Sequence, residues 1–568
     1  MTSPQDTSAP VQPAAGSAQP LDPKRWLALA VVLVAAFMDL LDVTIVNVAI
    51  PSIQRNLNAG YSEIQWVAAG YALAFAAGLI TGGRLGDIYG RKRIFLIGIV
   101  GFTAASALCG IATGPQFLIG ARVFQGAMAS LMVPQILAII HVTFPKEERG
   151  KVFGMYGGIA GSATVFGPII GGLLVQYNIL GLHWRPIFLA NVPIGIFGVL
   201  ATLAYIRESK SETALKLDLG GMLLATAGVL LLVYPLTEGR QLHWPGWAFG
   251  MLGASVAVLA LFVYYSQVTA RRGGYPLLPL SLFKARSFAG GFSVNLAFNL
   301  ATGSFFLMWT LYMQIGLGWT PLHAGLTGLP FSVGLAIAAA MSVQYLAPSM
   351  GRYTLITGGI IVCLGALLFI GTADRYGAGI DSWKMIPALF LLGAGVGLVV
   401  STLMDFALTD VPPEAAGSAS GAINMTWQAG MTIGIAIVGV IFLSPLSGQA
   451  ARSVDSLAPR ISTQLTAAGV PAPLDGPIIA GYKTCAQDLA GETDPTVVPA
   501  SCKQAPPPGL PPQTAAKIGQ VLTAQTPTVQ ADAFSRALKI GLIYVIGLVL
   551  VVTAMMFSLP KKAKPQEL

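Results

Sequence analysis

Two acidic residues, Asp39 and Asp42, lie inside an apolar run of the sequence that covers residues 26–50. Residues three apart in a helix occupy neighbouring parts of one face. An ionisable group in a membrane core costs roughly 2.5–3.5 kcal/mol on insertion scales, so it normally faces a cavity or a partner. We expect Arg122, in the apolar run 116–142, to be that partner.

The depth of each residue in its run supports this pairing. At about 1.5 Å per helical residue, Asp42 lies roughly 24 Å from the start of its run. Arg122 lies roughly 9 Å from the start of its own run, which enters from the opposite side. In a core of about 30 Å these two depths nearly coincide, and Asp39 lies a little deeper.

A buried carboxyl group beside a guanidinium is suited to carrying a proton. Burial favours the neutral carboxyl and the nearby cation favours the carboxylate, so a modest motion can change which form is stable. Each proton moved down about 100 mV releases about 2.3 kcal/mol, enough for a roughly fifty-fold solute gradient. The sequence favours Asp42 over Asp39 as the carrier, because Asp42 lies in a motif described below. A static structural ion pair is the alternative.

Polar and aromatic side chains in other apolar runs are candidates for a substrate cavity, since amides and aromatics suit large amphipathic solutes. These candidates are Gln125, Asn295, Asn299, Asn424, Trp427 and Gln428. The alternative for each is an interhelical hydrogen bond or a packing contact.

Several other chemistries are not expected. The sequence contains no G-x-x-x-x-G-K-[ST] loop for ATP hydrolysis. Its four His residues are scattered, which predicts no metal site. Without a cofactor or a catalytic constellation, we expect a protein that is not an enzyme and that draws energy from the proton motive force.

The composition requires a membrane. Only 10% of the 568 residues are charged and 54% are hydrophobic, and the mean hydropathy is +0.69. A span needs about 20 apolar helical residues, and the sequence therefore predicts an all-α integral membrane protein. Fourteen spans are expected, near 26–50, 62–83, 93–112, 116–142, 150–177, 186–206, 217–236, 246–267, 288–314, 322–346, 353–372, 384–404, 417–444 and 537–559.

The distribution of Lys and Arg predicts the orientation. The connections on one side of the spans contain twenty basic residues, and the short connections on the other side contain five. Because positive residues stay on the cytoplasmic side, both chain ends are predicted on the cytoplasmic side of a bacterial inner membrane. The net charge of +9 is therefore interpreted as an orientation signal, and no nucleic acid partner is expected. No cleavable signal peptide is visible, and residues 1–25 read as a disordered tail.

The segment 445–536 is Pro/Ala/Gln/Thr-rich and is expected to be a mostly irregular loop on the outer side. Cys485 and Cys502 both lie in it, and they are candidates for a disulfide if that side is oxidising. Docking of a periplasmic adaptor protein by this loop is an open alternative.

An internal repeat predicts two similar halves. Pro145-x-Glu147-x-x-Gly150-x-x-x-Gly154 returns 267 residues later, beginning at Pro412, and Gly90-Arg91 has an echo in Gly351-Arg352. We expect six-span bundles at 26–206 and 288–559, two inserted spans in 207–287, and a short tail at 560–568. Such halves, with a site between them, are the plan of an alternating-access carrier.

The segment from Gly83 to Arg93, GRLGDIYGRKR, resembles the cytoplasmic signature loop of the major facilitator superfamily, although Ile88 stands where a basic residue is common. The resemblance implies that Asp87 accepts bonds from Arg91 or from the start of span thirteen and holds an inner gate shut. The implied gate residues are Gly83, Asp87, Gly90, Arg91, Lys92 and Arg93.

Three further motifs resemble the fourteen-span drug:proton antiporter branch. They are Leu41 to Pro51 (LDVTIVNVAIP), Arg122-Val123-Phe124-Gln125-Gly126, and a pattern in span five with Ala163 in place of a usual glycine. The antiporter-motif residues of span five are Gly154, Gly167, Pro168, Gly171 and Gly172.

The resemblance implies proton-coupled efflux of small amphipathic compounds, multiple drugs or toxic cations among them. Two alternatives stay open. One is a transporter of the same fold for a lipid, a siderophore or another metabolite. The other is a membrane sensor that binds a partner through residues 445–536.

Overall fold

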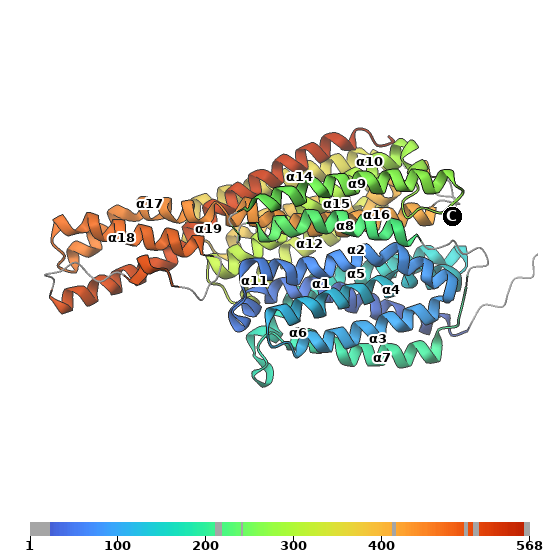
Figure 1. Cartoon of the computed structure of the whole chain (residues 1–568), viewed down its shortest axis with the longest axis horizontal. Helices are drawn as coiled ribbons and strands as arrows, with labels where there is room; N and C mark the ends of the chain where they lie inside the picture. Colours follow the sequence, from blue (N-terminus) through green and yellow to red (C-terminus); the bar gives the residue numbers. More distant parts are fainter. Residues whose placement is uncertain are drawn as a thin grey trace, which may run out of the picture.

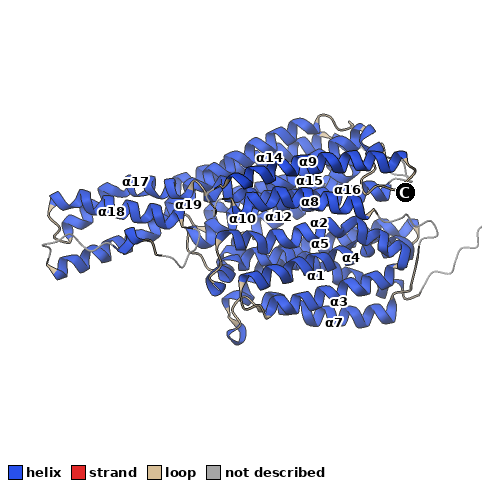
Figure 2. Ribbon diagram, in the orientation of Figure 1, coloured by secondary structure: helices blue, strands red, loops and turns tan. Residues whose placement is uncertain are grey.

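The computed structural model describes residues 23–210, 218–239, 242, 244–411, 416–492, 498–503 and 511–561. Helices dominate, and the described residues contain no β-strand. Figure 1 and Figure 2 show the helices running along the long axis of the molecule. The first half of the chain contributes α1 (Arg25–Leu57), α2 (Tyr61–Tyr89), α3 (Arg91–Gly110), α4 (Pro115–Thr143), α5 (Lys146–Gln176), α6 (Pro186–Leu189) and α7 (Asn191–Tyr205).

The second half follows two further helices. These two are α8 (Leu219–Glu238) and α9 (Gly246–Arg271). The remaining helices are α10 (Arg286–Leu311), α11 (Pro321–Thr327), α12 (Leu329–Met341), α13 (Ala347–Met350), α14 (Tyr353–Tyr376), α15 (Ser382–Leu408), α16 (Ala416–Val438), α17 (Leu446–Ala467), α18 (Ala472–Gly491) and α19 (Pro512–Met556).

The helices follow the fourteen predicted spans in order, and thirteen of them are candidate membrane spans within the described residues. Within the described residues, twelve helical segments are long and apolar enough to cross a membrane, and α2, bent by 46° after Leu79, makes a thirteenth. Helix α5 is 31 residues long, but several of its side chains lie outside the described part, and the apolar stretch described there is the shorter Phe166–Gln176. The prediction of an all-α membrane fold of two bundles with two inserted helices is confirmed. The domain boundaries given above stay predictions, and residues 1–22 and 562–568 lie outside the described residues.

The segment 445–536 is helical, so the prediction of a mostly irregular loop is wrong. Helices α17, α18 and the first part of α19 form a helical extension that projects from one end of the molecule (Figure 1). The extension has its own apolar core, formed by Val454, Ile461, Leu465, Val470, Ile478, Ile518 and Val529. Burial of these side chains, at about 25 cal/mol per Å², is what makes the segment fold.

The two ends of the molecule differ in how the halves meet. We call them the extension end and the terminal end, where α1 begins and α19 finishes. At the extension end, residues of both halves share one apolar cluster, in which Ile50 and Ile53 of α1 lie with Phe305 and Met308 of α10. At the terminal end the clusters formed by the described residues are separate. One contains residues of the first half, one contains residues of the second half together with Phe262 of α9, and one contains residues of the second half alone.

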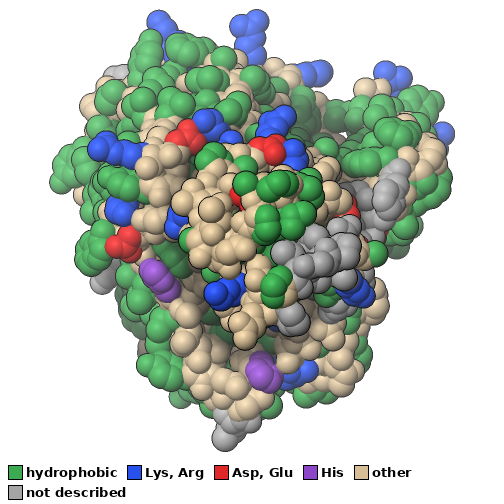
Figure 3. Space-filling model, turned by 90° about the vertical axis from the view of Figure 1, so that its left-hand side faces the viewer, with side chains coloured by type: hydrophobic (Ala, Val, Ile, Leu, Met, Phe, Trp, Pro, Cys, Tyr) green, Lys and Arg blue, Asp and Glu red, His purple; other side chains and the backbone are tan. Residues whose placement is uncertain are grey.

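Hydrogen bonds join the halves at the same end. Gln65 of α2 donates to the carbonyl of Ile435 at 2.9 Å, and Gln314 donates to the carbonyl of Val48 at 2.8 Å. The extension end is therefore the closed end of this structure. Figure 3 views the molecule from this end, where charged side chains and His lie scattered among apolar ones.

Candidate functional site

The first acid of interest, Asp42, lies in a fully buried polar cluster. Its exposed fraction is 0% and that of Arg122 is 2%, and the two side chains form an ion pair. Gln125 and Asn191 donate to the other carboxylate oxygen, Oδ1, at 2.9 and 3.0 Å. Arg122 Nε donates to the carbonyl of Val67 at 3.2 Å. The predicted Asp42–Arg122 pair is therefore present, and the carboxylate of Asp42 accepts hydrogen bonds from three side chains.

A serine holds the two amides in place. Ser106 Oγ accepts hydrogen bonds from Gln125 at 3.3 Å and from Asn191 at 3.0 Å, and it donates to the carbonyl of Phe188 at 3.0 Å. The cluster thus draws side chains from α1, α3, α4 and α7. Sequence reasoning missed Ser106 and Asn191, because a lone polar residue in an apolar run gives no sign of its partner.

The second acid, Asp39, is also buried, with 5% of its surface exposed, but its surroundings differ. Among the described residues, Tyr71 is the sole hydrogen-bond donor to Asp39, at 2.6 Å from its hydroxyl. The ring of Tyr71 lies 4.2 Å from the guanidinium carbon of Arg122. Asp39 therefore contacts the same aromatic residue as Arg122 but forms no ion pair with any residue that the structure describes.

The predicted gate begins at a sharp break between α2 and α3. Gly90 has φ of +113°, a conformation that favours glycine. One turn apart, Arg91 donates to Asp87 at 2.8 Å, which is one of the two predicted contacts of this acid. The other predicted contact involves residues 412–415, which lie outside the described residues.

The basic residues that follow contact a segment that sequence reasoning did not consider. The backbone N–H groups of Lys92 and Arg93 donate to the carboxylate of Glu208 at 3.1 and 3.2 Å. A carboxylate at the start of a helix is favourable, because the first N–H groups have no partner within the helix. The motif is thereby attached to the segment after α7, within its own half.

The beginning of the same motif contacts the second inserted helix. Arg84 donates to the carbonyls of Tyr275 and Pro276 at 3.1 and 3.0 Å, just after α9. Gly83 faces Pro134 of α4, at a distance that allows an ordinary contact for a Cβ atom.

Glycines of the span-five motif allow close packing on two sides of α5. A Cβ atom at Gly167 or Gly171 would meet Thr44 or Ile45 of α1. Gly172 faces the backbone of Leu322 in α11, across the boundary between the halves. The carbonyl of Pro168 likewise lies against Gly325 of α11. Gly154 is in α5, in a stretch whose side-chain surroundings are outside the described part.

The predicted cavity residues separate into three groups. Gln125 belongs to the buried cluster around Asp42. Asn295 of α10 donates to the carbonyl of Ile423 at 2.8 Å and to Thr426 at 2.9 Å, and Asn299 donates back to Asn295. These two amides join α10 to α16 within the second half.

The α16 candidates are more exposed. Trp427 is 40% exposed, and Asn424 and Gln428 are half-buried. The structure therefore does not bring all six candidate residues to one cavity. In the helical extension, Cys485 and Cys502 form a disulfide. No group of His, Cys, Asp and Glu with metal-binding geometry is found in the described ranges.

The helix arrangement defines a multi-pass membrane protein with a buried charged cluster between its helices. The family model of the Major Facilitator Superfamily matches residues 32–435, so the chain belongs to this superfamily of transport proteins and is not an enzyme. The chain is 39% identical to the probable actinorhodin transporter of Streptomyces coelicolor, over 99% of this chain and 96% of the relative. It is 36% identical to the multidrug resistance protein Stp of Mycobacterium tuberculosis, over 72% and 74%.

Solved structures share the fold. A bacterial homolog of the human lysosomal transporter Spinster, in an inward-facing and occupied conformation, has a TM-score of 0.60 at 13% identity. The match covers 94% of this chain and 97% of the other. A POT family transporter in complex with 5-aminolevulinic acid has a TM-score of 0.55 at 16% identity, over 73% and 90%.

Proposed function

We propose that this protein exports small amphipathic compounds, including antibiotics, across a bacterial inner membrane in exchange for protons. The names of its relatives support the cargo class, since they include the actinorhodin transporter, the Stp protein and the puromycin resistance protein pur8 of Streptomyces alboniger, which is 33% identical over 77% of this chain. The observation that carries the proton coupling is the pair of buried acids, Asp39 and Asp42, beside Arg122.

The two acids have different roles in this proposal. Asp42 accepts hydrogen bonds from Arg122, Gln125 and Asn191, and the guanidinium of Arg122 balances its charge. Among the described residues, Asp39 has one neutral donor and no ion pair. Asp39 is therefore the proton carrier, which reverses the preference drawn from the sequence, and Asp42 fixes the orientation of Arg122.

The proposed orientation has both chain ends in the cytoplasm and the helical extension outside. The disulfide of the extension supports this orientation, since disulfides persist in oxidising compartments. The closed extension end then faces outwards, and the described conformation is one in which the halves separate towards the cytoplasm. Transport alternates this state with one in which the halves tilt and separate at the extension end.

The signature loop has a conformational role in this cycle. The ion pair between Asp87 and Arg91 holds the end of α2 to the start of α3, and Glu208 holds α3 to the segment after α7. These contacts keep the terminal end of the first half rigid as it tilts.

The test uses everted membrane vesicles, in which respiration acidifies the lumen. Adding a transported dye is expected to release protons from vesicles that contain the protein, and an uncoupler is expected to stop dye uptake. Vesicles without the protein are the control. Dye uptake that survives complete collapse of the proton gradient would refute proton coupling and leave the fold assignment intact.

A further inference from the structure

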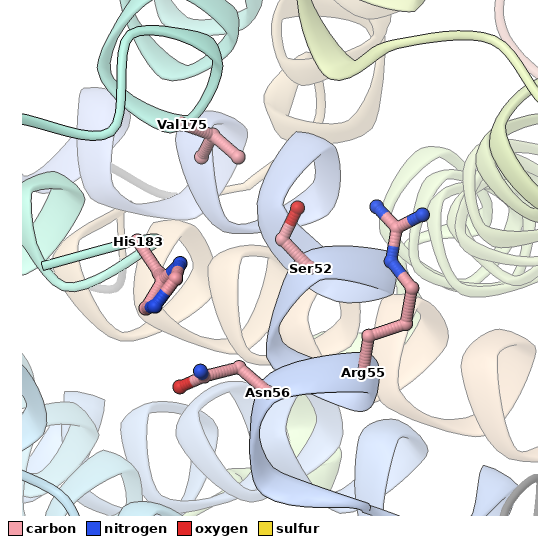
Figure 4. Close-up of a pocket in the computed structure, with 5 residues that line it drawn as sticks. All are labelled: Ser52, Arg55, Asn56, Val175 and His183. Carbon is pink, nitrogen blue, oxygen red and sulfur yellow. The ribbon is translucent and has the colours of Figure 1, made fainter. Parts of the chain in front are cut away.

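A cavity of about 290 Å³ lies at the extension end, away from the buried acids (Figure 4). It is lined by Ser52, Arg55 and Asn56 of α1, Val175 of α5, and His183 in the segment before α6. In Figure 4 Ser52 lies between Arg55 and His183. Four of the five side chains can donate hydrogen bonds, and none of the described residues that line the cavity is Asp or Glu.

The amide of Asn56 has a defined orientation. Its Oδ1 accepts from Trp184 Nε1 at 3.1 Å and from Arg185 Nη1 at 2.9 Å. Because both neighbours can only donate, the oxygen must be on their side. The Nδ2 group of Asn56 is therefore a donor without a partner among the described residues.

The other donors are also unused. Within the described part of the chain, the guanidinium of Arg55, the hydroxyl of Ser52 and the ring of His183 have no hydrogen-bond or ion-pair partner. The backbone of His183 has a φ of +53°, which is uncommon for a residue other than glycine. The backbone N–H of His183 donates to Asn178 Oδ1 at 2.6 Å. This bond fixes the backbone from which the ring of His183 reaches the cavity.

The charge around the cavity is positive. The nearby Arg185 uses Nη2 to donate to the carbonyl of Ala112 at 2.7 Å, so its own hydrogen bonds are partly satisfied. Arg55 has no such partner, and its planar guanidinium suits a carboxylate or a phosphate group. An excess of donors and positive charge in one cavity is complementary to an oxyanion.

We propose that this cavity is an oxyanion site, for a group of the phosphate or carboxylate type, at the extension end of the first half. The site goes beyond the export function, since Asp39, Asp42 and Arg122 take no part in it. Two sources supply such a group, namely the headgroup of an anionic phospholipid and an acid dissolved in the water at this membrane face.

The test measures binding of inorganic phosphate to the full-length protein in nanodiscs of neutral phosphatidylcholine, by isothermal titration calorimetry. The matched control for Arg55→Gln is Arg375→Gln, because Arg375 also lies in the last turn of a helix, α14, at the same end. Wild type and R375Q are expected to bind phosphate with the same Kd, and R55Q at least about tenfold more weakly.

Equal phosphate affinity in R55Q and wild type overturns the proposal, as does the absence of binding in every form. In both cases Arg55 only neutralises the end of α1. If R55Q does not fold, Ser52→Ala gives the same test, with an expected several-fold loss. Dye-driven proton release from everted vesicles is expected to be unchanged in R55Q. Phosphate binding therefore tests the oxyanion site, and proton release tests the export function separately.

A second set of nanodiscs distinguishes the two sources. If a lipid headgroup fills the site, added phosphatidylglycerol weakens phosphate binding to wild type and R375Q, and native mass spectrometry finds this lipid retained by wild type more than by R55Q. If the source is a dissolved acid, phosphatidylglycerol has no effect and benzoate displaces phosphate from wild type. Either result supports an oxyanion site.

Discussion

The guanidinium of Arg122 donates to the carboxylate of Asp42 where both side chains are almost fully buried. Removing one partner of a buried ion pair leaves the other charge uncompensated, which typically costs about 3–5 kcal/mol. Asp42 is therefore needed to balance the buried charge of Arg122, in addition to lying near the proposed proton carrier, Asp39.

Asp42→Asn is therefore expected to lower the thermal stability of the purified protein strongly. Asp374→Asn is the matched control, because Asp374 pairs with Lys539 at the surface and is about half exposed. Surface pairs contribute about 0–1 kcal/mol, so the control should melt near the wild-type temperature. Melting is followed by fluorescence-detected size exclusion. Equal melting of both variants would contradict the structural role of Asp42.

Tyr71→Phe removes the sole described donor to Asp39 without changing the ring that lies against Arg122. A hydrogen bond to a charged group contributes about 1.5–3 kcal/mol. Without it the balance between the protonated and ionised forms of Asp39 changes, so the pH of half-maximal efflux is expected to shift by about one unit or more. An unchanged pH profile would mean that this hydrogen bond has no part in coupling.

Gly172→Val is expected to slow efflux about tenfold, because the added side chain meets the backbone of Leu322 where the halves close. Gly120→Val is the control, since Gly120 has open space around its Cβ position. Efflux of a fluorescent substrate from loaded cells measures both. Similar rates for the two variants would show that closure at the extension end tolerates a larger residue.

The disulfide between Cys485 and Cys502 closes a separation of 17 residues. A loop of this length corresponds to about 3 kcal/mol of stabilisation in the chain-entropy model. The double variant Cys485→Ser/Cys502→Ser is expected to be cut in the extension by trypsin much faster than the wild type, as is the wild type in reductant. Efflux should change little, because the acids lie in the other half. Equal cutting of oxidised and reduced wild type would argue against this contribution.

Much of the fold follows from the sequence, because about 20 apolar residues in a row have few alternatives to a membrane helix. The Asp42–Arg122 pair was also predictable, since a helix rises by a fixed amount per residue and two depths can be compared. Asn191, Ser106 and Glu208 were not predictable in this way. Their partners lie on other helices. The rotation of a helix about its axis depends on its packing against other helices, which the sequence of that helix alone does not determine.

The sequence of the helical extension contains a helical pattern that the prediction of an irregular loop did not take into account. Apolar residues of α17 recur at spacings of three and four, at Leu446, Ala450, Val454, Leu457, Ile461 and Leu465. This spacing is typical of an amphipathic helix. The prolines at 459, 471 and 527 obscured it, although α17 and α19 continue through two of them. The separation of the candidate cavity residues likewise depends on helix rotation, and no spacing in the sequence encodes it.

The most direct test of the account is proton release by Asp39→Asn. Purified protein in proteoliposomes, acidified inside, is exposed to a transported dye while the internal pH is recorded. The variant is expected to fold, because Tyr71 can still donate to the amide oxygen, and to exchange dye across the membrane, but to release no protons in response to dye. Dye-driven proton release at the wild-type rate would contradict the assignment of Asp39 as the carrier.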